Sequence, residues 1–386
     1  MIPAGWTEVR LGDCARMRSG GTPLTTVSAY YGGDIPWASI SDMSSSRKYL
    51  KVTERYLTDE GLKNSAAVLF PPQTLLYAMY ASIGECCIST REMATSQAIL
   101  GIECGESLNV EFLFYVLQSR RAEVVRSGQQ GTQANLNAQM VRDMCIPLPA
   151  APEQRAIAEA LADADALVES LDALIAKKRD MKQAAMQQLL TGRTRLPGFT
   201  DDWREERLGD ICEIVMGQSP ESRHYNRAGN GLPLIQGNAD IANRRTIQRV
   251  WTTSAPKRAE AGDVLLTVRA PVGAVGRASA EVCLGRGVCA VKSNEVVSDF
   301  LFHALVAGEP RWSALEQGST FTAANGRDVA DFTVCVPEQH SEQQAIAEVL
   351  SDMDDEIDAL VAQREKAELV KQGMMHELLS GRVRLV

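Results

Sequence analysis

The most regular hydrophobic pattern in the chain is a seven-residue repeat that occurs twice. Apolar side chains recur at alternating steps of four and three in residues 157–189, and the same spacing returns in residues 346–378. A seam of this kind over five heptads is typical of a coiled coil. Polar residues interrupt both seams, namely Lys178 and Lys182 in the first and Arg364 and Lys371 in the second, and Lys182 and Lys371 stand at matching places. Each stretch predicts a helix of about 36 residues, roughly 55 Å long at 1.5 Å per residue.

The ends of both helices carry capping signals. Pro152 suits a first helical position, Ser341 and Gln344 fit a capping box, and Gly192 and Gly381 suit C-terminal caps. A helix this long with one apolar stripe needs a partner, so we expect the two helices to form an antiparallel coiled coil. The alternative is that each helix packs on its own neighbouring globular segment.

The two helical stretches belong to a longer internal repeat. EQRAIAEAL at residues 153–161 returns as EQQAIAEVL at residues 342–350, and TGRTRL returns as SGRVRL. Upstream, the spacing W-x4-LGD that begins at Trp6 recurs from Trp203, and Val386 stands at the position equivalent to Pro197. We therefore interpret the chain as two tandem units, each a globular segment followed by a helix. The expected segments are residues 1–148, 149–197, 198–337 and 338–386.

The globular segments predict mixed α/β structure. Short β-rich runs between Gly- and Pro-marked turns occur at Ala67–Phe70, Thr74–Tyr77 and Asp263–Val268. One helical pattern occurs in each segment, near Val110–Arg121 and Val297–Ala307. The expected fold class is α+β, with two mixed α/β domains joined by two long antiparallel helices in a pseudo-two-fold repeat.

Composition narrows the class of protein. Hydrophobic residues make up 45% and charged residues 23% of the 386 residues, which is ordinary for a globular protein. No apolar run reaches the ~18 residues of a membrane span, and the N-terminus shows no export signal. Nine scattered cysteines without a CxxC pair predict reduced, buried thiols, and four dispersed histidines predict no metal cluster. A cytoplasmic protein is the expectation.

The net charge of −9 is unevenly spread. Residues 338–386 carry 5 basic and 11 acidic side chains, whereas residues 1–148 carry 13 and 14. The globular segments are thus nearly neutral and could each present a basic face. Acidity of the whole chain does not exclude DNA as a partner.

Enzyme signatures are missing from the sequence. It contains no phosphate-binding P-loop, no G-x-S-x-G elbow and no H-E-x-x-H helix. Gly285–Ala290 fits the pattern G-x-G-x-x-A but lacks the following helix of a dinucleotide site. We expect no catalysis and no cofactor.

The repeated loops are instead rich in small polar and basic residues. Gln, Asn, Arg, Ser and Thr are the side chains that contact base edges and phosphates. For any single residue here, turn formation or the solvated surface is the favoured interpretation, so only the joint pattern supports DNA binding. The candidates in the first unit are Gly20, Thr22, Arg47, Lys48, Gln97, Thr132, Gln133 and Asn135. Those in the second unit are Gln218, Ser219, Gln236, Asn238, Arg244, Arg269, Arg286, Ser319 and Thr320.

Taken together, these motifs resemble the specificity (S) subunits of type I restriction-modification systems. The similarity rests on the E-Q-x-A-I-A-x-x-L helices, the W-x4-LGD motif, VRAPVGAVGRA at 268–278, CLGRGVCAV at 283–291 and GSTFTAAN at 318–325. The resemblance implies a non-catalytic subunit with two target-recognition domains, each of which binds half of a bipartite target in double-stranded DNA. It also implies helices that space these domains and dock two methyltransferase (modification) subunits, with endonuclease/translocase subunits in the full complex. Candidate partner-binding residues on the helices are Glu153, Gln154, Glu342 and Gln343.

One position departs from the repeat. The first unit has Met79–Gly84 where the second has Arg269–Gly273, so a phosphate contact by Arg269 does not transfer to the first domain. Two other classes stay open at this point. A single-chain restriction or methyltransferase enzyme would need the missing catalytic motifs, and a coiled-coil scaffold would leave the repeated polar loops unexplained.

Overall fold

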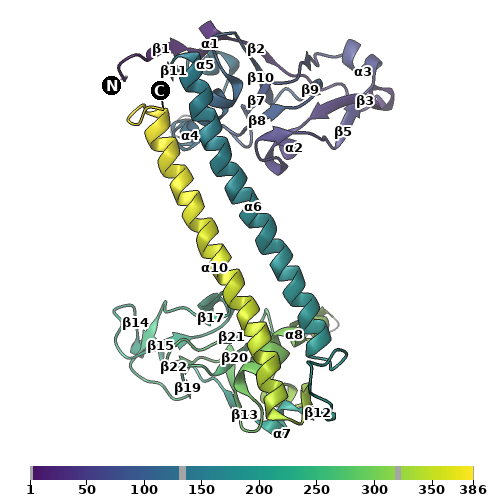
Figure 1. Ribbon diagram of the computed structural model, residues 1–386, viewed down its shortest axis with the longest axis vertical. Coiled ribbons are helices and arrows are strands. Elements are labelled where there is room, and N and C mark those ends of the chain that lie inside the picture. The colour runs from purple at the N-terminus through teal and green to yellow at the C-terminus, as the bar shows by residue number, and fades with distance from the viewer. Residues whose placement is uncertain (1–2, 130–135, 318–322, 386) are drawn as a thin grey trace. The chain divides into compact units, whose positions relative to one another are not determined.

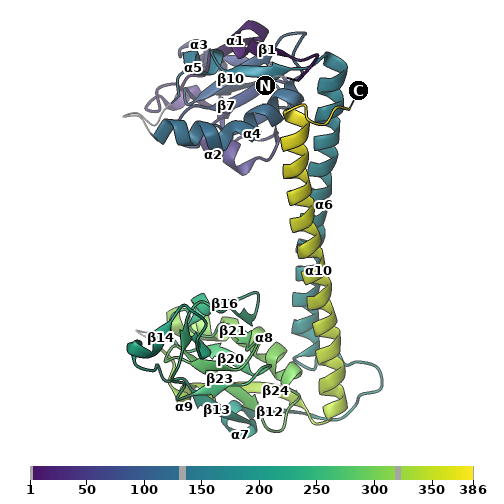
Figure 2. The same cartoon turned by 90° about the vertical axis from the view of Figure 1, so that its left-hand side faces the viewer.

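The computed structural model describes residues 3–129, 136–317 and 323–385, and the chain divides into two compact units. Unit 1 consists of Met1–Asp172 with Gln363–Val386, and unit 2 consists of Ala173–Ala362. The two longest helices, α6 (Ala151–Leu189) and α10 (His340–Leu379), each pass from one unit into the other (Figures 1 and 2). Each unit therefore contains one globular domain and one half of both helices.

The domain of unit 1 holds a five-stranded and a four-stranded sheet, with orders β2-β10-β7-β8-β4 and β5-β3-β9-β6, and a small ribbon of β1 with β11. Its strands are β1 (Thr7–Arg10), β2 (Ala15–Ser19), β3 (Tyr31–Ala38), β4 (Tyr49–Leu50), β5 (Arg55–Leu57), β6 (Leu69–Phe70), β7 (Leu75–Ala78), β8 (Cys86–Ser89), β9 (Met93–Thr95), β10 (Ile99–Cys104) and β11 (Cys145–Leu148). Its helices are α1 (Leu11–Cys14), η1 (Ser28–Tyr30), α2 (Ile40–Ser45), α3 (Asp59–Lys63), α4 (Val110–Gln129) and α5 (Ala138–Arg142).

The domain of unit 2 repeats this plan with a six-stranded sheet, β13-β23-β20-β21-β17-β16, a five-stranded sheet, β14-β18-β15-β22-β19, and a ribbon of β12 with β24. Its strands are β12 (Trp203–Arg207), β13 (Cys212–Met216), β14 (Tyr225–Asn226), β15 (Leu232–Ile235), β16 (Ile241–Ala242), β17 (Arg245–Thr246), β18 (Trp251–Thr252), β19 (Arg258–Ala259), β20 (Val264–Thr267), β21 (Val275–Arg277), β22 (Val282–Leu284), β23 (Val288–Ser293) and β24 (Thr333–Pro337). Its helices are α7 (Leu208–Ile211), η2 (Ser222–His224), η3 (Asn238–Asp240), α8 (Ser298–Gln317) and α9 (Gly326–Ala330).

The sheet orders confirm the repeat and the mixed α/β class. The antiparallel run β2-β10-β7-β8 in unit 1 corresponds to β13-β23-β20-β21 in unit 2. The predicted helical patterns become α4 and α8, and the β-rich runs contribute β6, β7 and β20. The last strands of the two domains end at Leu148 and Pro337, just before the long helices begin.

The halves of α6 and α10 pack antiparallel within each unit, as the heptads predict. In unit 1, Lys371 pairs with Asp165 at 2.6 Å and Arg364 with Asp172 at 3.1 Å, so residue numbers rise along one helix as they fall along the other. The seam positions Ile157, Leu161 and Ile175 are buried. The polar interruptions of the seam are therefore basic side chains that meet a carboxylate on the opposite helix.

The same arrangement occurs in unit 2. There Lys178 pairs with Glu356, and Lys182 pairs with Asp354. The pair Lys182–Asp354 is the repeat equivalent of Lys371–Asp165, because both partners are displaced by 189 positions. This charge pair therefore recurs in both units, whereas Lys178–Glu356 and Arg364–Asp172 have no equivalent in the other unit.

The helices also pack on the globular domains, which was the alternative considered. Ile157 and Leu161 of α6 belong to the hydrophobic core of unit 1, together with Phe112 of α4 and Leu378 of α10. Both interpretations hold, because the middle of each helix pairs with its partner while its ends complete a domain core.

The capping predictions for α6 and α10 hold at the C-terminal ends of both helices but not at the N-terminus of α10. Gly192 and Gly381 have φ near +66°, a left-handed conformation that suits glycine after a helix, so the C-terminal caps are confirmed. The capping box at Ser341 is wrong. Helix α10 already begins at His340, and the carbonyl of Gln339 accepts from the amides of Glu342 and Gln343.

The cysteines follow the expectation in part. Cys87, Cys212, Cys283 and Cys289 are buried, whereas Cys145 and Cys335 are exposed and all nine are free thiols. Burial raises the pKa of the Cys87 and Cys289 thiols to about 12, so these two stay protonated. In the part of the chain that the structure describes, no helix combines the length and apolar character that a membrane crossing requires.

Candidate nucleic-acid interface

In unit 2, loops from distant parts of the sequence are bonded into one cluster at the ends of β13, β15, β20 and β23. The amide of Gly217 donates to the carbonyl of Val288 at 3.0 Å, and that of Gln218 donates to Leu284 at 2.9 Å. The amide of Gly285 donates to Ile235 at 2.7 Å.

Three further bonds complete this cluster. The amide of Arg286 donates to the Ser219 hydroxyl at 3.1 Å, and that of Val268 donates to the carbonyl of Gly287 at 2.9 Å. The amide of Ala324 in turn donates to Val268 at 2.8 Å. Hydrogen bonds thus connect the segments 217–219, 235–238, 268–269, 284–288 and 323–324 into one loop cluster.

Unit 1 contains an equivalent of each of the five backbone–backbone bonds in this cluster. The amide of Gly20 donates to Ile99 at 3.0 Å, and that of Gly21 donates to Thr95 at 2.9 Å. The amide of Ser96 donates to the carbonyl of Ala38 at 2.9 Å, and that of Met79 donates to the carbonyl of Ala98 at 2.8 Å. The amide of Leu136 donates to the carbonyl of Met79 at 3.1 Å. Two surfaces of identical backbone design therefore carry different side chains.

The predicted residues of unit 2 that this cluster gathers present their side chains to solvent. Arg269, Arg286, Gln218, Gln236 and Asn238 are exposed, and Ser219 is partly exposed. The backbone next to Arg286 packs closely against the segment that contains Gln236. A Cβ on the next residue, Gly287, would lie 2.0 Å from the Gln236 carbonyl oxygen, so only glycine fits there.

In unit 1 the gathered candidates are fewer. Gln97, the equivalent of Arg286, is exposed, and Thr22, the equivalent of Ser219, is partly exposed. Gly20 is buried, and a Cβ there would lie 2.1 Å from the Thr95 hydroxyl, so its contribution is close packing and a backbone bond. Tyr80 stands at the position of Arg269 with 37% of its surface exposed. It is an aromatic candidate that the sequence analysis did not include.

The remaining loop candidates Thr132, Gln133, Asn135, Ser319 and Thr320 lie outside the described residues.

Several predicted cations lie elsewhere and already have partners. Lys48 is buried, and its ammonium contacts Glu111 at 2.6 Å and the Tyr115 hydroxyl at 3.2 Å. Its charge is therefore paired inside the domain, which does not support the expected contact with DNA phosphate. Arg47 is exposed but pairs with Asp172 of α6 at 2.9 Å. Local sequence could not reveal these pairings, because the partner of Lys48 is 63 residues away and that of Arg47 is 125 residues away.

Arg244 likewise lies outside the loop cluster. Its guanidinium forms a bidentate ion pair with the Glu309 carboxylate of α8: Nη1 contacts Oε1, and Nη2 contacts Oε2 at 2.9 Å. Its φ of 62° places it at a left-handed turn beside Asn243.

The four helix residues proposed for partner binding are buried. Glu153, Gln154, Glu342 and Gln343 expose at most 2% of their surface, and each is bonded within its own unit. A partner that docks on these helices would have to touch other, exposed side chains.

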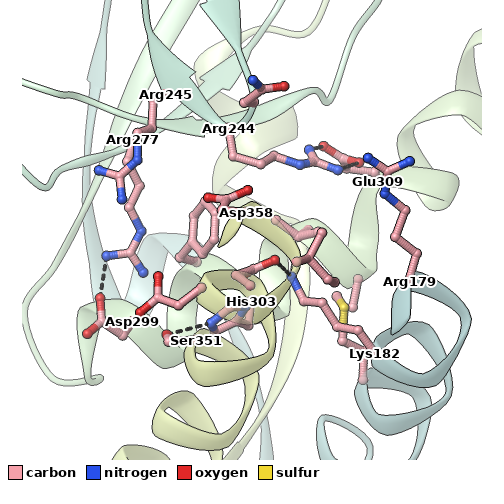
Figure 3. Close-up of a pocket in the computed structure, with 18 of the residues that line it drawn as sticks. Arg179, Lys182, Arg244, Arg245, Arg277, Asp299, His303, Glu309, Ser351 and Asp358 are labelled. Atoms are coloured by element: carbon pink, nitrogen blue, oxygen red, sulfur yellow. Dashed lines mark hydrogen bonds and ion pairs between the residues drawn. The ribbon is translucent and has the colours of Figure 1, made fainter. Parts of the chain in front are cut away.

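Arg244 also lines a cleft between the unit 2 domain and the helix pair (Figure 3). This cleft has a volume of about 1290 Å³. In its floor the His303 ring bonds the Ser351 hydroxyl at 3.1 Å, while Arg277 pairs with Asp299. Burial, with a contribution from nearby Lys182, lowers the pKa of His303 to about 4, so the ring is neutral. The corresponding cleft of unit 1 is much smaller, about 370 Å³.

The His303 site is the repeat counterpart of the Tyr115 site in unit 1. There the Tyr115 hydroxyl donates to Asp165 at 2.6 Å, and Lys48 pairs with Glu111 where Arg277 pairs with Asp299. Within the described residues no group of His, Cys, Asp and Glu side chains could hold a metal ion. The Tyr115–Asp165 and His303–Ser351 bonds attach the globular domains to the long helices.

Comparison with known proteins agrees with this geometry. The family model for the type I restriction modification DNA specificity domain matches twice, over residues 3–177 and 200–370. The fold and the duplicated loop surfaces define a two-domain protein of the DNA-specificity class, and the chain belongs to this family.

Individual relatives point the same way. A protein of Methanocaldococcus jannaschii assigned as the type I restriction enzyme MjaX specificity subunit is 32% identical over 266 residues, or 66% of this chain. The MjaVIII specificity subunit of the same organism is 22% identical over 418 residues, covering 100% of this chain and 94% of that protein. The chain spans 62% of the MjaX protein and 58% of the MjaIX specificity subunit.

Two solved structures share the fold. A type I restriction-modification S subunit from M. genitalium matches with a TM-score of 0.65 at 15% identity, over 98% of this chain and 96% of that chain. A chain from a structural study of complex assembly in a type I R-M system matches with a TM-score of 0.63 at 24% identity, over 99% of this chain and 100% of that chain.

Proposed function

We propose that this chain is the DNA sequence-recognition (specificity) subunit of a type I restriction-modification complex. Each globular domain binds one half of a bipartite target in double-stranded DNA. The chain carries out no catalysis itself and needs no cofactor, and methylation and cleavage belong to other subunits.

The observation that carries this proposal is the duplicated loop cluster. Two surfaces with the same five backbone bonds display different exposed side chains, such as Gln97 in unit 1 and Arg286 in unit 2. Arginine pairs with guanine edges and glutamine with adenine edges in the major groove, so unlike side chains on like scaffolds suit two different half-sites. Exposed Arg269 adds a cation for phosphate or base contact.

The proposed protein partners are two modification (methyltransferase) subunits, with endonuclease/translocase subunits joining in the full complex. Exposed apolar side chains on α6 support a docking surface: Leu167, Leu174 and Met181 expose 49%, 38% and 47% of their area at seven-residue spacing. On α10, Leu369 and Val370 expose 67% and 53%. Exposed apolar groups on a helix face are typical of protein–protein contacts.

The test is methylation by a purified complex of this chain with its cognate modification subunit. Sequencing the methylated sites should return a single bipartite target with a fixed gap. The mass of the complex in solution should correspond to two modification subunits for each copy of this chain. A stable one-to-one complex that methylates both half-sites would contradict the proposed stoichiometry.

The alternative of a single-chain restriction or methyltransferase enzyme finds no support in the comparisons, because the relatives are named as specificity subunits. S-adenosylmethionine binding by the isolated chain separates the two functions. We expect no binding, and a measurable affinity would favour the enzyme.

A further inference from the structure

The repeated E-Q pair at the start of each long helix is a buried joint between helix and domain. In unit 2, the side-chain amide of Gln343 donates to the carbonyl of Pro337 at 2.9 Å. Its carbonyl oxygen accepts from the amide of Val297, next to the start of α8, at 2.8 Å. One side chain thus connects the end of β24, the start of α8 and the first turn of α10.

Unit 1 has the same joint with one bond more. The Gln154 amide donates to the carbonyls of Pro149 and Ser107, both at 2.9 Å, and its oxygen accepts from the Asn109 amide at 2.8 Å. Gln154 and Gln343 expose only 1% and 2% of their surface.

The adjoining glutamates fix the other side of each joint. Glu342, which is fully buried, accepts two bonds from Arg195 at 2.6 and 2.7 Å. Glu153 accepts two bonds from Arg384, one of them at 2.7 Å, and a third from the Trp6 ring nitrogen at 3.1 Å. Each glutamate thereby ties the start of one long helix to the segment that follows the end of the other.

A buried polar network of this kind specifies one geometry. Apolar side chains would fill the same space in several orientations, whereas directional bonds to three elements are satisfied in one orientation only. The two joints share residue types and distances although the loops around them differ. This identity indicates that the angle between domain and helix is what the E-Q pair maintains.

We propose that Gln154 and Gln343 are positioning residues that fix each recognition domain on its helix, and so determine how strictly the protein measures the gap between half-sites. This inference rests on the proposed function. One base pair of extra gap moves a half-site by ~3.4 Å along the DNA and turns it by roughly 35°. A rigid joint rejects such a displacement, and a loosened joint accepts it.

The experiment compares Gln343→Met, Gln343→Glu and the matched control Gln344→Met, each in complex with the modification subunit. Gln344 is the exposed neighbour of Gln343, and its side chain donates to Glu348 one turn away on the same helix. The substrates are DNA fragments with the native half-sites and gaps one base pair shorter, equal and one longer. The measured quantity is the methylation rate at the native gap divided by the rate at the neighbouring gaps.

We expect Gln343→Met to lower this ratio roughly threefold to tenfold, the effect of losing one or two net hydrogen bonds. Gln343→Glu keeps the acceptor for Val297 but replaces the donor to Pro337 with a buried carboxylate oxygen that faces a carbonyl, so it should lower the ratio at least as much as Gln343→Met. The control should keep the wild-type ratio. Hydrogen exchange at the Val297 amide should accelerate in Gln343→Met alone, which a general loss of activity would not produce.

An unchanged ratio in a folded Gln343→Met complex overturns the inference. If that variant does not assemble, an unchanged ratio in Gln343→Glu overturns it equally. A wild-type complex that methylates DNA without preferring any gap contradicts the proposed function and the inference together. A wild-type preference that the variants keep contradicts the inference alone.

Discussion

A one-heptad insertion in both long helices tests whether they determine the gap in the DNA target. The structure indicates the insertion points: between Asp172 and Lys178 in α6 and between Glu356 and Arg364 in α10. The pair Arg364–Asp172 belongs to unit 1, and Lys178–Glu356 belongs to unit 2. Seven residues placed between them leave every cross-helix pair of both units, and both E-Q joints, in register.

The magnitude follows from helix geometry. Seven residues at 1.5 Å each lengthen the helix pair by about 10.5 Å. At 3.4 Å per base pair this corresponds to a gap about three base pairs longer. Three base pairs also turn the DNA by roughly 100°, whereas a heptad turns the helix surface by only ~20°. We therefore expect a longer gap, unchanged half-sites and a slower methylation rate.

The assay is sequencing of methylated sites in DNA exposed to the variant complex, with the wild type in parallel. An insertion in α6 alone is the matched control, because it moves the charged partners of the two helices out of register by two turns. That control should fail to assemble or lose activity. Altered half-sites with an unaltered gap in the double insertion would refute the spacer role.

Three other predictions concern the site, the core and the chain order. If Arg269 contacts phosphate, Arg269→Ala should weaken DNA binding across all sequences and lower the slope of log affinity against log salt concentration by about one unit. If Arg269 contacts a base, the variant should instead relax the preference at one target position, at a cost of ~1–3 kcal/mol. Unchanged DNA affinity in a folded variant would exclude both roles. Leu161→Ala removes a fully buried side chain and should lower the free energy of unfolding by about 2–5 kcal/mol in a denaturant titration, whereas Leu167→Ala, at an exposed position, should change it by less than about 0.5 kcal/mol. A circular permutant joins the two chain ends by a short linker and opens the chain at exposed Gly198. It should fold and, with the modification subunit, methylate the same sites, because the Arg384 guanidinium contacts the Ala4 carbonyl at 2.6 Å and the new ends lie in an exposed segment. A soluble permutant with a changed target would contradict the pseudo-symmetric arrangement.

The long helices show how far sequence alone reaches. Their apolar spacing predicted the helix pair, and the glycines at 192 and 381 predicted where the helices end. The polar interruptions of the seam were visible as well. Their carboxylate partners, such as Asp354 for Lys182, could be identified only after the antiparallel register was known.

The candidate DNA surface was predictable in part. Gln97 and Arg286 were both candidates from sequence, and the structure places them on equivalent loop clusters. Lys48 was misjudged because a lysine in a loop looks exposed in sequence, whereas the fold buries it against Glu111 and Tyr115. The E-Q pairs were proposed for partner binding because they repeat, and the fold uses them internally instead.

The sequence by itself determined the helix period, the tandem repeat, the α+β class and the loops that differ between the units. These properties depend on local spacing and on direct comparison of one half with the other. Tertiary structure alone decided which charged groups are exposed and which are paired, because their partners lie tens to hundreds of positions away, as with Glu153 and Arg384, 231 residues apart. Burial and pairing of charge are long-range properties of the fold, and local sequence patterns do not encode them.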